Sequence, residues 1–246
     1  MSSLAGKTAL VTGGSRGIGA AIVRRLADAG AHVAFTYAAS REKADALVVE
    51  IGNAGGTAIA LQADNRDVEA VQAAVREAAG RLSRIDILVN NAGVLQAGPV
   101  SELGMDAYET TMSINVRAAY AAVLAAEPHL PDGARLIFTG SNIAQRVPGP
   151  GMTLYAMSKA ALTGLAKGLA RDYGGRNITA NIVHPGSTDT DMNPAQGDFA
   201  DAQRQGMAIS RFSDPDDVAA MVAWLAGPDA RSVTGAELVV DNGTNA

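Results

Sequence analysis

The chain has 246 residues, of which 48% are hydrophobic and 18% are charged. Both fractions are typical of a folded globular protein and exclude an intrinsically disordered chain. Its 20 Lys and Arg residues against 25 Asp and Glu residues give a formal net charge of -5, and no basic cluster is long enough to follow a nucleic-acid backbone. The absence of cysteine excludes disulfides, thiolate nucleophiles and Cys-ligated zinc, and the three histidines lack metal-ligand spacing. We therefore expect neither a metal site nor a nucleic-acid partner.

The N-terminal residues show no charged segment followed by an apolar stretch and a cleavage site, as a secretory signal would. The longest apolar run, residues 118–126, is far shorter than the roughly 20 residues that a membrane-spanning helix needs. We expect a cytoplasmic protein that does not contact a membrane.

In chain order, short apolar segments rich in β-branched residues alternate with longer segments of helical periodicity. Strands are predicted at residues 7–12, 31–37, 57–64, 85–93, 134–140, 178–186 and 237–241. Helices are predicted at residues 17–30, 40–55, 67–82, 105–127, 154–174 and 215–226. Because the strand segments are almost continuously hydrophobic, we expect a parallel sheet with helices on both faces. The predicted architecture is a single α/β domain over residues 1–246, a Rossmann fold with a doubly wound parallel sheet of about seven strands.

The segment 189–211 is polar, contains glycine and follows the sixth predicted strand. Ligands bind at the carboxyl ends of the strands in such folds. The segment is therefore a candidate lid over the substrate.

The first predicted strand leads through TGGSRGIG, residues 12–19, directly into a helix. Gly13, Gly17 and Gly19 let the backbone turn sharply and let a pyrophosphate approach the helix N-terminus, where free N–H groups favour negative charge. This position in an α/β pattern predicts a dinucleotide site.

The end of the second predicted strand indicates which dinucleotide is bound. An NAD site usually has a carboxylate there for the ribose 2'-hydroxyl, but this chain has Tyr37. Arg16 in the glycine loop, with Ser40 and Arg41 just after the strand, suits the 2'-phosphate of NADP. The alternative is that Arg16 and Arg41 are solvated surface residues.

Tyr155 and Lys159 are four positions apart on a predicted helix, so they share one face of it. A free tyrosine, with a pKa of about 10, is almost entirely protonated at neutral pH and is a poor base. A positive charge about 4 Å away stabilises a phenolate by roughly 4 kcal/mol. We therefore expect Lys159, if it points into the cleft, to lower the pKa of Tyr155.

These motifs occur with NNAG at 90–93, with Asn115 in SINVRAA, with Ser141 after a strand and with PGSTDTDM from Pro185. Together they closely resemble the classical short-chain dehydrogenase/reductase family, over essentially the whole chain. The sequence is similar to the 3-oxoacyl-carrier-protein reductase type. It also resembles, in GGSRGIGAAIVRR, FTYA and MVAWLAGP, a branch described as cyclic-di-GMP-binding mediators of biofilm dispersal.

The resemblance implies that Tyr155 is the general acid in reduction and the base in oxidation, while Lys159 also binds the nicotinamide ribose. It implies that Ser141 hydrogen-bonds the substrate oxygen and that Asn115 holds a water that relays protons. It also implies a homotetramer or homodimer built on the helices that carry Asn115 and Tyr155. The further cofactor contacts that it implies are Ser15, Ile18, Asp64, Asn65, Asn91, Ala92, Gly93, Pro185, Gly186, Thr188 and Thr190.

The sequence departs from the family's pattern at two places. Ser141 lies one position farther from Tyr155 than is common, so the following loop carries an inserted residue or Asn142 takes the serine's place; we favour Ser141, which ends a strand as expected. The C-terminal DNGTNA lacks the usual paired glycine, which leaves the conformation of this loop open. His184 we interpret as a packed or hydrogen-bonded residue.

The predicted function is an NADP-dependent oxidoreductase that interconverts a ketone, or a 3-oxoacyl group, and a secondary alcohol. The alternative is a protein that binds cyclic di-GMP on the same scaffold, although a pure binding protein has no need for a tuned phenol. A modest apolar substrate pocket is indicated by Val94, Leu95, Val147, Pro148, Met152, Leu154 and Met192.

Overall fold

The computed structural model describes residues 4–246, and its seven strands form one parallel sheet in the order β3-β2-β1-β4-β5-β6-β7. The order reverses between β1 and β4, as in a doubly wound sheet, so the predicted Rossmann architecture is confirmed. The strands are β1 (Thr8–Val11), β2 (His32–Tyr37), β3 (Thr57–Gln62), β4 (Ile87–Asn90), β5 (Arg135–Thr139), β6 (Thr179–Pro185) and β7 (Glu237–Val240). The α-helices are α1 (Gly17–Asp28), α2 (Arg41–Asn53), α3 (Val68–Leu82), α4 (Val100–Met112), α5 (Ala118–Ala126), α6 (Thr153–Asp172), α7 (Ala200–Gln205) and α8 (Pro215–Ala226).

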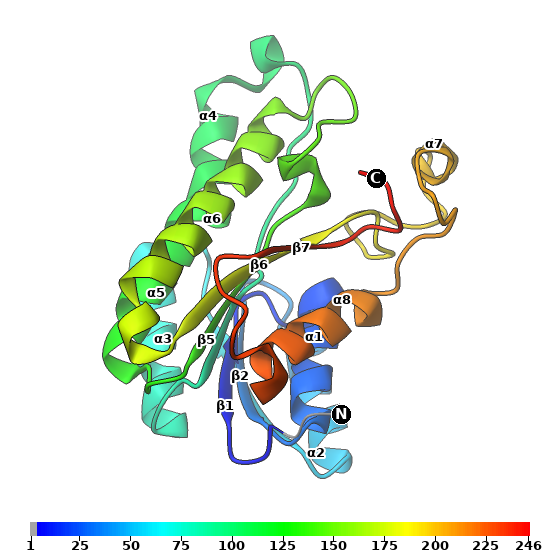
Figure 1. Cartoon of the computed structure of the whole chain (residues 1–246). Coiled ribbons are helices and arrows are strands. Elements are labelled where there is room, and N and C mark those ends of the chain that lie inside the picture. The colour runs from blue at the N-terminus through cyan, green and yellow to red at the C-terminus, as the bar shows by residue number, and fades with distance from the viewer. Residues whose placement is uncertain (1–3) are drawn as a thin grey trace.

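Helices cover both faces of the sheet (Figure 1). The helices α3, α5 and α6 pack on one face, where Leu88, Leu136 and Phe138 are fully buried. The helices α1, α2 and α8 pack on the other, around Phe35 and Val89. This two-sided burial explains why the strand segments are almost continuously hydrophobic. Within residues 4–246, no helix is both long and apolar enough to cross a membrane.

The predicted helix 105–127 is not continuous. It is preceded by a turn at Gly104, whose φ is 63°, and is interrupted at Ser113–Arg117 by a π-helical turn between α4 and α5. A π turn accommodates one extra residue, which a helical hydrophobic pattern does not reveal. The interruption points Asn115 into the protein, where it is 1% exposed.

The candidate lid, residues 189–211, contains the short helix α7, which the sequence did not predict. The guanidinium of Arg204 lies 5.0 Å from the centre of the Phe212 ring. The side chain of Gln203 exchanges hydrogen bonds with that of Asn193, at 2.9 and 3.0 Å. Ala200, Met207 and the following Phe212 form a small apolar cluster here, and the segment lies beside the carboxyl ends of the strands (Figure 1).

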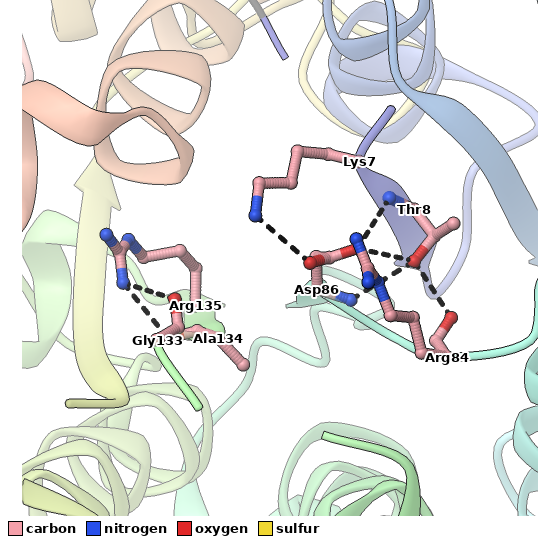
Figure 2. A network of polar contacts seen from close by, with 7 residues as sticks. All are labelled: Lys7, Thr8, Arg84, Asp86, Gly133, Ala134 and Arg135. Atoms are coloured by element: carbon pink, nitrogen blue, oxygen red, sulfur yellow. Dashed lines mark hydrogen bonds and ion pairs between the residues drawn. The ribbon is translucent and has the colours of Figure 1, made fainter. Parts of the chain in front are cut away.

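At the opposite edge, where the strands begin, a charged network joins β1 to the start of β4 (Figure 2). The buried Asp86 carboxylate accepts hydrogen bonds from Lys7 at 3.2 Å and from Arg84 at 2.9 Å. It also accepts from the backbone and hydroxyl of Thr8, at 3.0 and 2.9 Å. On the neighbouring strand Arg135 donates instead to the carbonyls of Gly133 and Ala134. This edge is therefore braced by structural charge pairs.

Candidate active site

The glycine loop after β1 is shaped by positions that exclude side chains. Gly13 and Gly17 have φ values of 66° and 53°, which L-residues rarely adopt. A Cβ on Gly13 would lie 2.9 Å from the Cα of Ala92, and one on Gly19 would overlap the carbonyl oxygen of Gly13. The helix α1 that follows has no side-chain cap on its N-terminus. This cradle fits a pyrophosphate, which would bind at the uncapped helix end.

Asn91 and Thr12 hold this loop against the end of β4. The Asn91 amide donates to the carbonyls of Thr12 and Gly13, at 3.1 and 3.2 Å. The Thr12 hydroxyl accepts from the backbone N–H groups of Asn91 and Ala92, at 3.0 and 3.1 Å. Because these hydrogen bonds use the Asn91 amide, Asn91 stabilises the backbone of the glycine loop at the predicted cofactor site.

The predicted site for the 2'-phosphate contains a cation that the sequence analysis missed. The Lys43 ammonium and the Arg16 guanidinium both contact the Asp191 carboxylate, at 2.8 and 3.5 Å. All three side chains are more than half exposed. The two cations hold the pKa of Asp191 below its usual range, with Lys43 the larger influence. This pair of cations, which already binds an anion, fits a dianionic phosphate.

The other predicted residues at this end differ in their surroundings. Tyr37 is buried at 4% exposure, and the Arg41 guanidinium lies 5.9 Å from the centre of its ring. Ser40 precedes α2 without capping it. Asp64 is held by Arg66, whose hydrogen bonds lower the pKa of that carboxyl, and the Asn65 amide donates to the Ile114 carbonyl at 3.5 Å. Ser15 and Ile18 complete the glycine loop, and Ile18 packs against the hydrophobic core.

The segment after β6 closes over the same helix end. Gly186 lies against Asp241, where an added Cβ would be 2.6 Å from the aspartate Cβ. Thr188 is buried, and its hydroxyl donates to the Gly186 carbonyl at 3.1 Å. Thr190 lies beside the first turn of α1, because a Cβ on Gly17 would be 3.3 Å from its methyl group. Of the predicted residues in this segment, Thr190 therefore lies next to the glycine loop, while Gly186 packs against Asp241.

Ser141 and Tyr155 are brought together from β5 and α6. The Ser141 side chain lies close enough to the Tyr155 phenol to lower its pKa, and the Ser141 hydroxyl accepts from the N–H of Ile143 at 3.3 Å. The neighbouring Asn142 points elsewhere: its amide donates to the Asp241 carboxylate at 3.3 Å. The structure thus places Ser141, rather than Asn142, beside Tyr155.

Asp241 also organises the C-terminal loop, whose conformation the sequence left open. Its carboxylate accepts from the N–H groups of Gly243 and Asn245, each at 3.0 Å. The Asn245 amide donates to the Asn142 carbonyl at 2.7 Å. A single buried carboxylate therefore holds this loop, in which Asn242 and Gly243 adopt φ values of 55° and 73°.

Lys159 is 4% exposed and lies beneath the Tyr155 ring, with Nζ 5.8 Å from the ring centre. It donates a hydrogen bond to the Thr139 carbonyl at 2.9 Å. Burial lowers the pKa of this ammonium to about 8. A Cβ on Gly93 would be 3.1 Å from Nζ and 3.3 Å from Asn115 Oδ1, so Gly93 keeps the space between Lys159 and Asn115 open.

The expected lowering of the Tyr155 pKa by Lys159 is wrong for the protein without cofactor. Burial raises the pKa of the phenol, and the hydrogen bond with Ser141 only partly offsets this effect. Lys159 stabilises a phenolate only while it carries charge, and its own burial disfavours that charge. The resting site therefore holds a protonated phenol, which is the form that a proton donor requires.

Asn115 is fixed by the backbone of Val94 on the loop after β4. Its Oδ1 accepts from the Val94 N–H at 2.8 Å, and its Nδ2 donates to the Val94 carbonyl at 3.0 Å. The same Nδ2 group donates to the Ser158 hydroxyl at 3.0 Å, and Ser158 donates to the Tyr155 carbonyl at 2.8 Å. Asn115 thus links three segments of the site.

The predicted apolar pocket stays a prediction, because no contact between its members is among those found. Leu95, Val147 and Met192 expose apolar side chains at 37%, 52% and 50%, whereas Leu154 is buried. Leu154 therefore offers little surface to a substrate. The other members, Val94, Pro148 and Met152, lie on the loops around Ser141 and Tyr155.

Sequence reasoning missed three residues that contact the site: Lys43, Asp191 and Ser158. Lys43 and Asp191 are 148 positions apart in the chain, and no local pattern pairs them. Ser158 was detectable, because it lies three positions after Tyr155 on the same helix.

Residues 13–245 match the family described as Enoyl-(Acyl carrier protein) reductase. With this fold and these motifs, the chain belongs to the short-chain dehydrogenase/reductase family and is an NAD(P)-dependent oxidoreductase. It is 47% identical over 241 residues, 98% of each chain, to the cyclic-di-GMP-binding biofilm dispersal mediator protein of Escherichia coli. It is 35% identical over 239 residues to a 3-oxoacyl-(acyl-carrier-protein) reductase of Staphylococcus aureus, covering 96% of this chain and 97% of that one. A short-chain dehydrogenase from Burkholderia cenocepacia, crystallised with NADP, superposes with a TM-score of 0.97 at 56% identity over 99% of each chain.

Proposed function

We propose that the protein uses NADPH to reduce a ketone or 3-oxoacyl group to a secondary alcohol, with Tyr155 as the proton donor. The observation that carries this proposal is the meeting of Ser141, Tyr155 and Lys159 at one end of the sheet. The Ser141 side chain lies close enough to Tyr155 to act on its pKa, and the buried Lys159 lies 5.8 Å from the Tyr155 ring centre. A binding surface alone has no need for a buried ammonium beneath a phenol.

The bound nicotinamide supplies the hydride, and the chain supplies the proton and the stabilisation of charge. Tyr155, protonated at rest, donates its proton to the carbonyl oxygen of the substrate. The Ser141 hydroxyl hydrogen-bonds the same oxygen and stabilises the negative charge that develops there. Lys159 carries positive charge below its pKa of about 8 and stabilises the phenolate that remains on Tyr155.

Asn115 has a supporting role in this mechanism. Its amide is held on both sides by the Val94 backbone, so it cannot turn without breaking two hydrogen bonds. It thereby keeps the space beside Gly93 and Lys159 in shape for a water molecule that returns a proton to Lys159.

The preference for NADP rests on the charges around the end of β2. Arg16 and Lys43 bind the carboxylate of Asp191, and Ser40 and Arg41 begin the next helix. Position 37, where an NAD site usually has a carboxylate, is occupied by Tyr37. The NADP in the Burkholderia cenocepacia structure supports the same choice.

The proposed substrate class is supported by the exposed apolar side chains near the site and by the Staphylococcus aureus relative. Leu95, Val147 and Met192 offer apolar contact to an acyl or alkyl chain. Residues 189–211, which carry Met192, then act as the lid over this chain.

The first experiment is a titration of NADPH and NADH, followed by the fluorescence of Trp224 or of the bound nicotinamide. We expect NADPH to bind much more tightly than NADH, and a screen of ketones and 3-oxoacyl thioesters to reveal NADPH oxidation. If neither nucleotide binds, the oxidoreductase proposal fails.

A second candidate function, binding of cyclic di-GMP, is favoured by the 47% identity to the Escherichia coli dispersal mediator. Calorimetric titration with cyclic di-GMP, with and without saturating NADPH, tests it. Saturable binding would support this function. An absence of heat at high micromolar concentration would remove it, and NADPH oxidation would remain.

The proposal includes a cytoplasmic homotetramer or homodimer. Tyr120, Leu124 and Met157, on α5 and α6, are 52%, 51% and 43% exposed, which is unusual for large apolar side chains. Packing of these faces against a second copy would bury them. Sedimentation equilibrium measures the number of chains in the assembly. The cytoplasmic location is proposed because NADPH is supplied inside the cell.

A further inference from the structure

His184, near the end of β6, is completely buried and lies against the backbone of the Gly140–Ser141 turn. The ring nitrogen Nδ1 is 3.2 Å from the backbone nitrogen of Ser141 and 2.8 Å from its carbonyl oxygen. A Cβ on Gly140 would overlap this nitrogen, so no side chain separates the ring from the turn. His184 therefore contacts the residue that lies beside the Tyr155 phenol, without itself facing the substrate.

The other ring nitrogen is held by Glu237, at the start of β7. His184 Nε2 lies 3.2 Å from the Glu237 carboxylate, which also accepts from Lys167 at 2.7 Å and from Gln145 at 3.3 Å. The Lys167 hydrogen bond, as the largest influence, lowers the pKa of Glu237, so this carboxylate is charged at neutral pH. A charged carboxylate favours a proton on Nε2.

A proton on Nε2 determines what Nδ1 does. Burial lowers the pKa of His184, so the ring is neutral at neutral pH, and a neutral ring carries one proton only. Nδ1 then accepts the backbone N–H of Ser141 at 3.2 Å and faces the Ser141 carbonyl oxygen, 2.8 Å away, without donating to it. In the protonated ring Nδ1 would donate to the Ser141 carbonyl, so in both forms the ring binds the backbone of Ser141.

We infer that His184, oriented by Glu237, is a positioning residue that fixes the backbone of Ser141 and so aims its hydroxyl at Tyr155 and the substrate oxygen. This inference rests on the proposed role of Ser141 in carbonyl reduction. Small displacements of a group that stabilises a transition state reduce turnover more than they reduce substrate binding. His184 should therefore affect kcat more than KM, and it should act through Ser141.

The test compares two amides of different length. In His184→Asn the amide reaches the position of Nδ1 and can bind the Ser141 backbone in either direction, whereas in His184→Gln it reaches only the position of Nε2. We expect kcat to stay within a few-fold of wild type for His184→Asn and to fall about 10- to 100-fold for His184→Gln, with the NADPH Kd unchanged in both. Equal kcat values for the two variants, with similar Tm, would overturn the inference.

A double-variant experiment separates this inference from the proposed function. Ser141→Ala alone tests the proposed function, which fails if this variant keeps full activity. If Ser141→Ala does lose activity, adding His184→Gln should cause no further loss of kcat, because the positioned hydroxyl is already gone. An additive loss would overturn the positioning role and leave the proposed function intact.

Discussion

Each edge of the sheet buries an ionisable side chain with a lowered pKa. The lowered value favours the charged form of the carboxyl at one edge and the neutral form of the amine at the other. At the amino edge, burial alone would raise the pKa of Asp86, but hydrogen bonds from Arg84, Thr8 and Lys7 outweigh it and favour the charged form. At the carboxyl edge, burial lowers the pKa of Lys159 to about 8 and disfavours its charge. The surroundings therefore stabilise the charged form of Asp86 and destabilise the charged form of Lys159.

The difference lies in what surrounds each charge. Asp86 accepts from two cations and from the backbone of Thr8, whereas Lys159 has only the Thr139 carbonyl as an acceptor among residues 4–246. A charge that is already fully hydrogen-bonded stabilises the fold and gains no further stabilisation during a reaction. An ammonium whose charge is disfavoured by its site gains stabilisation when negative charge forms beside it. The comparison therefore predicts that substitutions at the two edges affect different measurements.

The largest expected effect is that of Tyr155→Phe on turnover. Loss of the proton donor should reduce kcat by about 10²- to 10⁴-fold, while the NADPH Kd and Tm remain close to wild type. Single-turnover oxidation of bound NADPH measures the chemical step directly. A variant with more than a tenth of wild-type kcat would show that the proton comes from another group.

The reverse pattern is expected for Asp86→Asn. The substitution weakens the contacts with Lys7, Arg84 and Thr8, and should cost about 1–3 kcal/mol of unfolding free energy while leaving kcat of the folded protein unchanged. Because the pKa of Asp86 is lowered by folding, its stabilisation is complete above the carboxyl pKa of the unfolded chain, about 4, and is lost as the pH falls through the lower folded value. Thermal melts of both proteins from pH 7 to pH 3 should therefore converge at the acidic end. Parallel curves would contradict the assigned charge.

The pH dependence of reduction should report on Lys159. Above its pKa of about 8 the ammonium loses its proton and no longer stabilises the Tyr155 phenolate, so kcat should fall by up to about tenfold per pH unit. The variant Lys159→Met should be slow throughout and should lack this limb. A wild-type profile that is flat from pH 7 to 9.5 would show that Lys159 keeps its charge in the working enzyme.

The smallest expected effect concerns the exposed charges around the glycine loop. Asp191→Asn removes the carboxylate that competes with a 2'-phosphate for Arg16 and Lys43, and should tighten NADPH binding by up to about fivefold. Lys43→Ala should weaken NADPH binding to a similar extent. NADH, which lacks the phosphate, is the control ligand, and equal changes in its Kd would place these residues away from the 2'-position. Both effects should shrink as salt is raised.

The sequence predicted most of the fold because the strands are buried on both faces and therefore read as continuous apolar runs. It did not predict the π-helical turn at Ser113–Arg117, since one extra residue leaves a helical pattern almost unchanged. The choice of Ser141 over Asn142 stays a prediction, and the contact that turns the Asn142 amide away comes from Asp241, 99 positions along the chain. The direction of the Tyr155 pKa was predicted wrongly, because desolvation depends on burial, which spacing along a helix does not reveal.

The strand order also has a consequence for how the protein is made. In the order β3-β2-β1-β4-β5-β6-β7, each strand taken in chain order has a free edge of the earlier strands beside it, and none lies between two strands that precede it. The glycine loop follows the first strand, whereas Asn115, Ser141, Tyr155 and Lys159 all follow the fourth. During synthesis the nucleotide half therefore has all its strands in place before any of the four catalytic candidates has a scaffold, which lets the sheet grow outward without rearranging.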